Sequence, residues 1–353
     1  MKRKILTVIL LIIFNNVFSQ NKMNDYEKYY YCMVGYLHPQ RVIESHNNWD
    51  LLNTLADGKT LSELDELGVT YSKKQLDILQ LLNFVKKQDE KYYSTVCILN
   101  EEKTKKMRSE TFKMATEIVN QISKDYSIFQ GILLKQGFEN NTYTVFFSYI
   151  MDNLVWDELE KQNYKTMREL TPEQPFWSGN VWFVNPKRNF SCGTNSITEN
   201  GSRANLNWSR NSGVSFNNYN SLSLMIDDYK KHQRITDEKN KEFLMTYGLC
   251  REDGSITFPI IRNDSLDEIN SISKNIAQTI INYLIKEIDF SSIMSQYGIQ
   301  TKTEAIVILF HEIMWDILDI MEENKQIKKP IAFSEPKNCK KTDLKDLFFV
   351  VEE

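Results

Sequence analysis

The sequence of 353 residues predicts the same succession of helix, hairpin and helix twice, and this repetition limits the possible folds more than any other feature. Asn83-Phe84 ends a helix and opens a hairpin in the first copy, and Gly248-Leu249 takes that place in the second, an offset of 249 − 84 = 165 residues. The apolar helical segments at 147–151 and 310–314 match at a similar offset, 310 − 147 = 163. Two matches at nearly one spacing predict an internal duplication, in which each segment buries its Phe, Ile and Met side chains in an equivalent core.

Capping signals mark the helix starts of the first copy. Thr60 and Glu63 have the spacing of a capping box, in which each side chain bonds to the backbone of the other residue. Ser72 and Gln75 repeat this spacing at the next helix. Asn100 stands where an N-cap would open a further, longer helix.

The segment 49–99 combines three short helices with a final hairpin. Residues 84–99 predict this hairpin because β-branched and aromatic side chains flank a polar turn. The succession resembles a winged helix-turn-helix module, a family in which the third helix reads DNA. This segment, however, carries six lysines against eight Asp and Glu residues, and the whole chain has a net charge of −4. The resemblance therefore implies the shape of the module, which equally serves protein contacts, while the charge predicts no nucleic-acid binding.

The second copy shows the same signals, with Asp253-Gly254 as its hairpin turn and Asp264 or Ser265 as the expected cap of the long helix that follows. We therefore predict a mainly α fold with small β-hairpins (α+β), made of tandem winged-helix-like plus helical units. The predicted boundaries are 1–19 (signal peptide), 20–46 (N-terminal segment), 47–162 (first unit), 163–219 (insert), 220–323 (second similar unit) and 324–353 (C-terminal tail, with a short strand or turn).

The insert between the two units is rich in Asn, Gly and Trp, a composition that excludes a long helix. Short apolar runs at 181–184 and 206–208 predict strands within an irregular β segment. One interpretation is an ordered loop whose amide side chains satisfy backbone groups. The other is a polar and aromatic face for a sugar or a peptide. The candidate ligand-binding residues, including one histidine on a helix of the second unit, are Trp177, Trp182, Asn185, Asn207, Trp208 and His311.

The first nineteen residues have the three parts of a cleavable signal peptide and resemble a bacterial export signal. Lys2, Arg3 and Lys4 precede an apolar run over 5–14, and small or modest side chains lead to Ser19. This run is well short of the roughly twenty residues that cross a bilayer. We therefore expect cleavage after Ser19 and a periplasmic or secreted mature protein without a stable membrane span.

No sequence motif identifies a catalytic, cofactor-binding or metal-binding residue. The five cysteines are scattered singly, without a C-x-x-C pair. His311 begins a pattern that resembles the zinc-binding helix of the zincins, but Trp315 stands where the second histidine is required. Cys192 stays open as a nucleophile with His232 or His311 as its base, because such a pair needs only proximity in space.

Three functions from different classes remain open. The first is an exported, non-enzymatic binding or assembly protein whose partner is an unknown protein, peptide or glycan. The second is a secreted or periplasmic hydrolase that uses Cys192 or a carboxylate pair such as Asp316 and Asp319. The third is a membrane-anchored DNA-binding regulator, which requires that the N-terminal segment is not cleaved. We favour the first, because neither motif nor charge supports the others.

Overall fold

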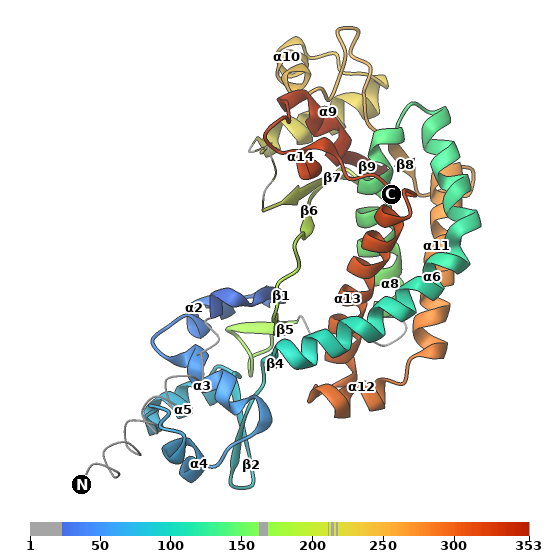
Figure 1. Ribbon diagram of the computed structural model, residues 1–353. Coiled ribbons are helices and arrows are strands. Elements are labelled where there is room, and N and C mark those ends of the chain that lie inside the picture. Colours follow the sequence, from blue (N-terminus) through green and yellow to red (C-terminus); the bar gives the residue numbers. More distant parts are fainter. Residues whose placement is uncertain (1–22, 162–168, 211, 213–214, 217, 353) are drawn as a thin grey trace, which may run out of the picture. The chain divides into compact units, whose positions relative to one another are not determined.

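The computed structural model of the chain describes residues 23–161, 169–210, 212, 215–216 and 218–352. The predicted signal peptide, 1–19, lies outside the described residues. Helices dominate the described chain and its strands form small sheets, which confirms the predicted α+β class (Figure 1).

The chain divides into two compact units, each assembled from separate stretches of sequence. Unit 1 comprises the described residues of 1–107, 166–188 and 291–307. Unit 2 comprises those of 108–165, 189–290 and 308–353. Both units therefore draw on the predicted first unit and on the predicted insert. This division does not test the internal duplication, which stays a prediction.

Unit 1 holds short helices and two small sheets. Its elements are η1 (Met23–Asp25), β1 (Glu27–Val34), α2 (Pro39–Ile43), α3 (Asn48–Thr54), η2 (Leu55–Asp57), α4 (Leu61–Glu66), α5 (Lys73–Leu81), β2 (Val85–Gln88), β3 (Lys91–Ser94), β4 (Cys97–Leu99), β5 (Trp177–Val184) and most of α12 (Phe290–Tyr297). The helices and the hairpin predicted from 49–94 occur in the predicted order. The resemblance to a winged helix remains an expectation.

The two predicted capping boxes of unit 1 have different outcomes. Thr60 and Glu63 form both bonds of the box at the start of α4, as predicted. Ser72 Oγ accepts the expected bond from the Gln75 backbone N–H at 3.1 Å. The Gln75 amide, however, donates to Asn48 Oδ1 at 2.7 Å. Gln75 therefore ties α5 to the start of α3, a contact that the local spacing does not encode.

The predicted strand at 91–99 is divided between two sheets. β3 pairs antiparallel with β2 and completes the hairpin, whereas β4 leaves it and pairs parallel with β5. At the break, Ser94 Oγ donates to the Val96 carbonyl at 3.0 Å and accepts from the Val96 N–H at 3.1 Å. These bonds satisfy backbone groups that the hairpin no longer pairs. Asn83 ends α5 with a φ of 60°, which confirms the left-handed terminator.

The three-stranded sheet of unit 1 joins segments that are distant in sequence. β5 lies in its middle, with β1 antiparallel on one side and β4 parallel on the other. The Phe183 ring of β5 contacts Trp49 of α3, with ring centroids 4.9 Å apart. Fully buried side chains from the short helices, among them Leu51 and Leu64, complete the core. Apolar burial thus fixes the helices against one sheet.

Unit 2 contains long helices and a four-stranded sheet. Its elements are most of α6 (Glu101–Lys135), η3 (Glu139–Asn141), α7 (Thr142–Thr144), the π-helix η4 (Val145–Val155), α8 (Trp156–Lys161), β6 (Cys192–Glu199), β7 (Ser202–Ser209), α9 (Tyr219–His232), α10 (Glu238–Thr246), β8 (Ile260–Arg262), α11 (Glu268–Glu287), most of α13 (Lys302–Glu323), α14 (Ile331–Ser334), η5 (Lys341–Leu347) and β9 (Phe348–Glu352). Asn100 caps α6 as predicted, since its Oδ1 accepts from the Lys103 N–H at 2.9 Å.

The helices α6, α11 and α13 surround η4 in unit 2 (Figure 1). Phe147 of η4 stacks on Trp315 of α13 with centroids 5.5 Å apart, and Trp156 of α8 stacks on Phe310 of α13 at 5.7 Å. The two similar segments, 147–151 and 310–314, therefore contact the same core within one unit. Their Phe, Ile and Met side chains are buried, as predicted.

The sheet of unit 2 has the strand order β6-β7-β9-β8. β9 comes from the predicted C-terminal tail and lies between β7, its antiparallel neighbour, and β8, its parallel neighbour. Four successive residues of β9, Phe348 to Val351, are buried. An unbroken apolar run of this kind suits a strand that is covered on both faces. The tail therefore supplies an inner strand of the sheet.

The second predicted hairpin occurs as a short turn. Cys250 and Ile256 form a single antiparallel bridge, and Gly254 in the turn has a φ of 80°. Gly248 ends α10 with a φ of 71°, which confirms the predicted left-handed terminator. The returning strand that follows, β8, pairs with β9.

The N-cap of α11 lies two or three residues after the predicted cap, which was Asp264 or Ser265. Asp267 is the cap, because its Oδ1 accepts from the Asn270 N–H at 2.8 Å. The predicted cap Asp264 instead accepts from the Asp267 N–H at 2.9 Å, and Ser265 takes no part in the cap. Two successive Asx turns thus precede the helix, and the sequence pattern alone did not identify the second as its start.

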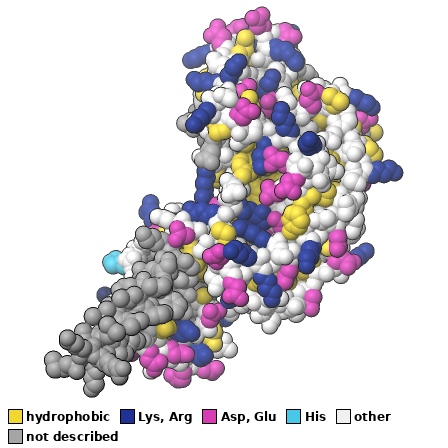
Figure 2. All heavy atoms as spheres, in the orientation of Figure 1, with side chains coloured by type: hydrophobic (Ala, Val, Ile, Leu, Met, Phe, Trp, Pro, Cys, Tyr) yellow, Lys and Arg dark blue, Asp and Glu magenta, His cyan; other side chains and the backbone are white. Residues whose placement is uncertain are grey.

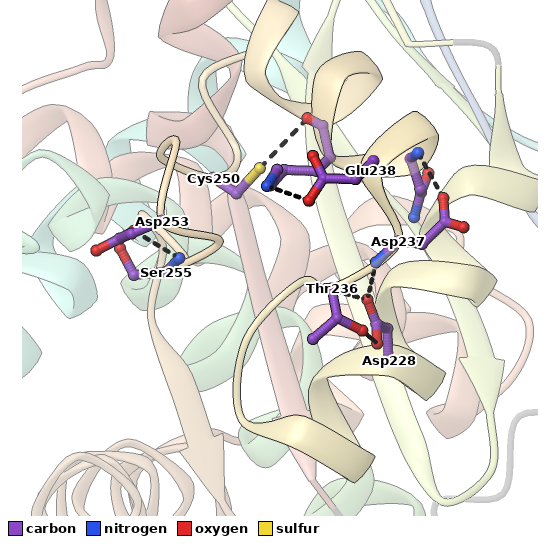
Figure 3. Close-up of polar contacts among 9 residues, drawn as sticks. Asp228, Thr236, Asp237, Glu238, Cys250, Asp253 and Ser255 are labelled. Atoms are coloured by element: carbon purple, nitrogen blue, oxygen red, sulfur yellow. Dashed lines mark hydrogen bonds and ion pairs between the residues drawn. The ribbon is translucent and has the colours of Figure 1, made fainter.

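Asp228 holds the connection between α9 and α10 (Figure 3). Its carboxylate accepts from Thr236 Oγ1 at 2.6 Å and from the Asp237 N–H at 3.0 Å. Partial burial raises the pKa of Asp228, but these hydrogen bonds together outweigh burial and the pKa is lowered. Asp237 in turn caps α10 through a 2.7 Å bond from the Asn240 N–H. The side chains of Asp228 and Asp237 therefore stabilise the connection and the start of α10.

The surface around α9 and α10 carries both signs of charge (Figure 2). Asp227 and Lys230 lie on α9, and Glu238 pairs with Lys241 on α10 at 2.8 Å. Lysines and arginines are interspersed there with Asp and Glu on the face shown. Such a surface presents no field of one sign to a polyanion.

Candidate functional site: a polar groove beside the π-helix

A groove of about 520 Å³ opens on unit 2 beside η4. Its walls come from η4, α8 and α11, from the strands β7 and β9, and from the residue that follows β8. A volume of this size is ordinary for a small-molecule site. The polar residues that line it are Tyr149, Asn153, Asp157, Glu158, Lys161, Arg203, Asn263, Lys274 and Gln278.

The π-helix gives this groove one polar wall. Tyr149 and Asn153 of η4 are followed in α8 by Asp157 and Lys161, at intervals of four residues. The neighbouring apolar residues of η4 are buried in the core of the unit. Eleven residues of π-helix are unusual, because this conformation generally occurs as single turns and is frequent at functional sites. The unusual backbone and the groove thus coincide.

Tyr149 of η4 and Arg203 of β7 are two of the less exposed polar residues of the lining. Tyr149 is buried and its hydroxyl donates to Asn270 Oδ1 at 2.7 Å, and burial raises the pKa of this phenol. The Arg203 guanidinium acts against that rise. Among the described residues, the buried Nε of Arg203 has no hydrogen-bond partner. A buried donor without a partner costs free energy, whereas the side chain of Arg203 also lines the groove and brings a positive charge to it.

The more exposed residues of the lining carry charges of both signs. Lys274 Nζ donates to Asn263 Oδ1 at 3.0 Å, so an amide holds this cation in place. Glu158 lies 3.8 Å from Lys161 Nζ, a loose and exposed pair that contributes little to stability. Asp157 adds a second carboxylate to the lining. The groove therefore offers partners for both an anionic and a cationic group of one ligand.

Three of the six predicted ligand-binding residues belong to unit 1 and serve its sheet. Trp177 is buried, and its Nε1 donates to the Leu82 carbonyl at 2.8 Å. Trp182 is buried and stacks on Tyr29 with centroids 4.8 Å apart. Asn185 uses its backbone N–H to bond the Leu99 carbonyl at 3.1 Å, at the end of β5.

The other three predicted residues belong to unit 2. Asn207 is buried, and its Oδ1 accepts from the hydroxyl groups of Ser148 and Thr194. Trp208 is 43% exposed on β7. His311 is half-buried with its ring edge-on to Trp156 at 5.8 Å. None of the six is among the described residues that line the groove.

Trp208 also covers the backbone of the neighbouring strand. Its ring lies so close to Gly193 that a Cβ added there would approach the indole to 2.7 Å. Gly193 and Trp208 are register partners in β6 and β7. The ring therefore fills the place of a side chain on the sheet, which accounts for a glycine at that position.

Sequence reasoning did not identify the groove, although one signal was present. Tyr149, Asn153, Asp157 and Lys161 form a polar series at a spacing of four within a helical segment that is rich in apolar residues. Such a series marks one face of a helix. Arg203 and Lys274 reach the same groove from β7 and α11, and no local pattern links these segments.

The candidate nucleophile Cys192 lies in the interior of unit 2. It is buried, and its recorded side-chain partner is the Tyr143 hydroxyl at 3.9 Å. Burial raises the pKa of this thiol, which opposes formation of the thiolate that catalysis requires. His232 lies 3.8 Å from Asp228. The surroundings of Cys192, as far as the structure describes them, therefore oppose its activation as a nucleophile.

The candidate carboxylates of α13 lie in different environments. Asp316 is buried and accepts from Thr111 Oγ1 of α6 at 2.6 Å, whereas Asp319 is exposed. One turn before Asp316, the buried Glu312 pairs with Arg108 Nε at 2.8 Å. These polar contacts tie α13 to α6 inside unit 2. Their burial indicates a role in helix association.

Within the described residues, no cluster of three or more histidine, cysteine or carboxylate side chains is arranged to hold a metal ion. None of the helices described in the structure is both long enough and apolar enough to span a bilayer.

Comparisons with models of protein families, with characterised proteins and with solved structures found no match to this chain.

Proposed function

We propose that this chain is an exported, non-enzymatic binding protein that takes a polar ligand with charges of both signs in the groove beside η4. The observation that carries the proposal is that Arg203 and Lys274 line the same 520 Å³ groove as Asp157 and Glu158. Export rests on the signal sequence at 1–19.

The lining of the groove favours a short peptide over a neutral glycan. Arg203 and Lys274 offer donors to a carboxylate, and Asp157 and Glu158 offer acceptors to an ammonium group. Charge-assisted hydrogen bonds are stronger and more selective than those between neutral groups. A peptide carries both charged groups, and its amides also match the amide side chains of the lining.

The first prediction concerns Arg203. Replacement by glutamine, Arg203→Gln, removes the guanidinium, and we expect it to weaken binding of a short cell-wall peptide by roughly tenfold to a hundredfold. Titration calorimetry of the purified exported protein with a panel of such peptides and of neutral oligosaccharides measures this effect. The wild-type protein should bind peptides that carry both charges and discriminate against their amidated, N-acetylated forms.

Arg234→Gln is the matched control, because Arg234 is an exposed arginine of the same unit that does not line the groove. The control should bind like the wild type. Equal binding by Arg203→Gln and the wild type would overturn the assignment of the groove. Preference for neutral oligosaccharides would overturn the ligand class.

A further inference from the structure

A second groove, of about 540 Å³, lies within unit 1 between α5 and the segment that contains α2 and the start of α3. Apolar atoms contribute most of its exposed lining surface, unlike that of the groove beside η4. Leu37, Val42, Leu79 and Leu82 contribute, together with Ile78, which is 44% exposed. Several apolar side chains gathered in one open groove are typical of a surface that contacts a ligand.

The polar residues of this groove are basic or neutral. Arg41, His46 and Lys74 belong to the lining, and no Asp or Glu is among the described residues that form it. The structure records no ion pair for Arg41 or Lys74 within the described part of the chain. The groove thus combines an apolar surface with cations that are open to an anionic partner.

Polarity changes along the groove in one direction. Lys74, Gln75, Ile78, Leu79 and Leu82 follow at helical spacing along α5, so that they share one face. The polar end lies at the N-terminus of α5, where the helix dipole also favours a negative charge. Leu82 follows Lys74 by eight positions, which corresponds to about 12 Å of helix rise. An extended alkyl chain of medium length matches that distance.

The polar end of the groove is held rigidly. The Gln75 amide donates to Asn47 Oδ1 at 2.9 Å and to Asn48 Oδ1 at 2.7 Å. Asn48 Nδ2 in turn donates to the Val42 carbonyl at 2.7 Å. This network joins α2, α3 and α5, so the groove is formed before a ligand arrives. In a preformed site, the ordering of the walls does not reduce the free energy of binding.

We propose that this groove binds an amphipathic carboxylate of the fatty-acid type, with the carboxylate at Arg41 and Lys74 and the alkyl chain on Ile78, Leu79 and Leu82. Charge complementarity identifies the head group, since the lining holds cations and no carboxylate. The apolar end identifies the tail. This site is separate from the groove beside η4, because all of its residues belong to unit 1.

Decanoate is the probe for this site, with decanol and decyltrimethylammonium as analogues of equal chain length. Titration calorimetry of the exported full chain should show saturable binding of decanoate, at least tenfold weaker binding of decanol, and none of the cationic analogue. The double replacement Arg41→Gln and Lys74→Gln should weaken decanoate binding at least tenfold and leave decanol unchanged. Ile78→Asp should weaken the binding of both.

Lys73→Gln is the matched control, because Lys73 precedes Lys74 on α5 but does not line the groove. Arg203→Gln should also leave decanoate binding unchanged, which separates this proposal from the peptide site. Equal binding of decanoate and decanol, or equal loss in the Lys73 control, would overturn the proposal. It would also be overturned if an acidic amphipathic peptide bound through Arg41 and Lys74 while decanoate did not.

Discussion

Glu304 is a buried carboxyl group of unit 1, with 6% of its surface exposed. Burial raises its pKa to about 7, and the backbone N–H groups of Gln300 and Thr301, followed by the charge of Lys86, act in the opposite direction. Gln300 donates from its N–H to Glu304 Oε2 at 3.1 Å. Because burial dominates, the folded protein retains a proton here that the unfolded chain has already lost at mildly acidic pH.

The raised pKa of Glu304 predicts how the stability of unit 1 depends on pH. The contribution is fully present below the unfolded pKa of 4.5 and is lost as the pH rises through the folded pKa of about 7. The loss is on the order of 3 kcal/mol. We therefore expect the urea midpoint of the wild type to fall between pH 5 and pH 8. Glu304→Gln keeps the acceptor for the Gln300 N–H without the charge, and its midpoint should fall less.

Glu90→Gln serves as the control for this experiment. Glu90 is exposed in the turn of the β2–β3 hairpin, so the control should keep the pH dependence of the wild type. An identical slope with pH in Glu304→Gln and in the wild type would contradict the assignment of the effect to this carboxyl group.

At the scale of elements, Gly248 limits how α10 can end. Its φ of 71° is a backbone conformation that residues with a Cβ rarely adopt. A Cβ at this position would approach the Thr342 backbone oxygen to 2.3 Å. Gly248→Ala should therefore destabilise unit 2 by the left-handed cost of about 1–2 kcal/mol plus a steric cost of similar size. Urea unfolding followed by circular dichroism measures the change.

Gly137→Ala is the comparison within the same unit. Gly137 follows α6 with a φ of 80°, but a Cβ added there would have no heavy atom within 4 Å. It should show only the conformational cost, so its midpoint should lie between those of the wild type and Gly248→Ala. If the two replacements were equally destabilising, the contact with Thr342 would have no energetic role.

Local signals predicted many elements of this fold. The Thr60 capping box, the terminators Asn83 and Gly248, and the cap Asn100 were identified because each depends on residues a few positions apart. The break after Ser94 was not predicted, since it depends on the pairing of β4 with β5, which lies far along the chain. Pairing between distant strands has no local signature.

At the scale of the whole molecule, the candidate site was harder to predict than the individual elements, because residues from distant segments form it. The insert was predicted as one segment with a shared ligand face, yet β5 belongs to unit 1 and β6 and β7 belong to unit 2. The composition of the insert predicted that Trp177 and Trp182 form part of a binding face. Both side chains are instead buried in unit 1. Composition reports which side chains are available, whereas only the tertiary fold decides which of them are exposed.

The prediction at this scale concerns processing of the whole chain. When the full sequence is expressed in a bacterium, the N-terminus of the accumulated protein should be Gln20, and the protein should be found in the periplasm or the medium. N-terminal sequencing of each cell fraction tests this. A chain that begins at residue 20 should remain inside the cell. Recovery of Met1 from the membrane fraction would contradict cleavage and favour the anchored regulator.

The position of β9 has a consequence for the order in which the protein can acquire its structure. β9 is an inner strand, but it follows β6, β7 and β8 in sequence and is the last of the four to be synthesised. Until it arrives, β7 and β8 lack the neighbour that joins them. A sheet whose inner strand is synthesised last favours slow folding, because pairings distant in sequence must wait for it. If the chain is exported unfolded, as its N-terminal sequence predicts, the sheet of unit 2 is completed only after β9 has crossed the membrane.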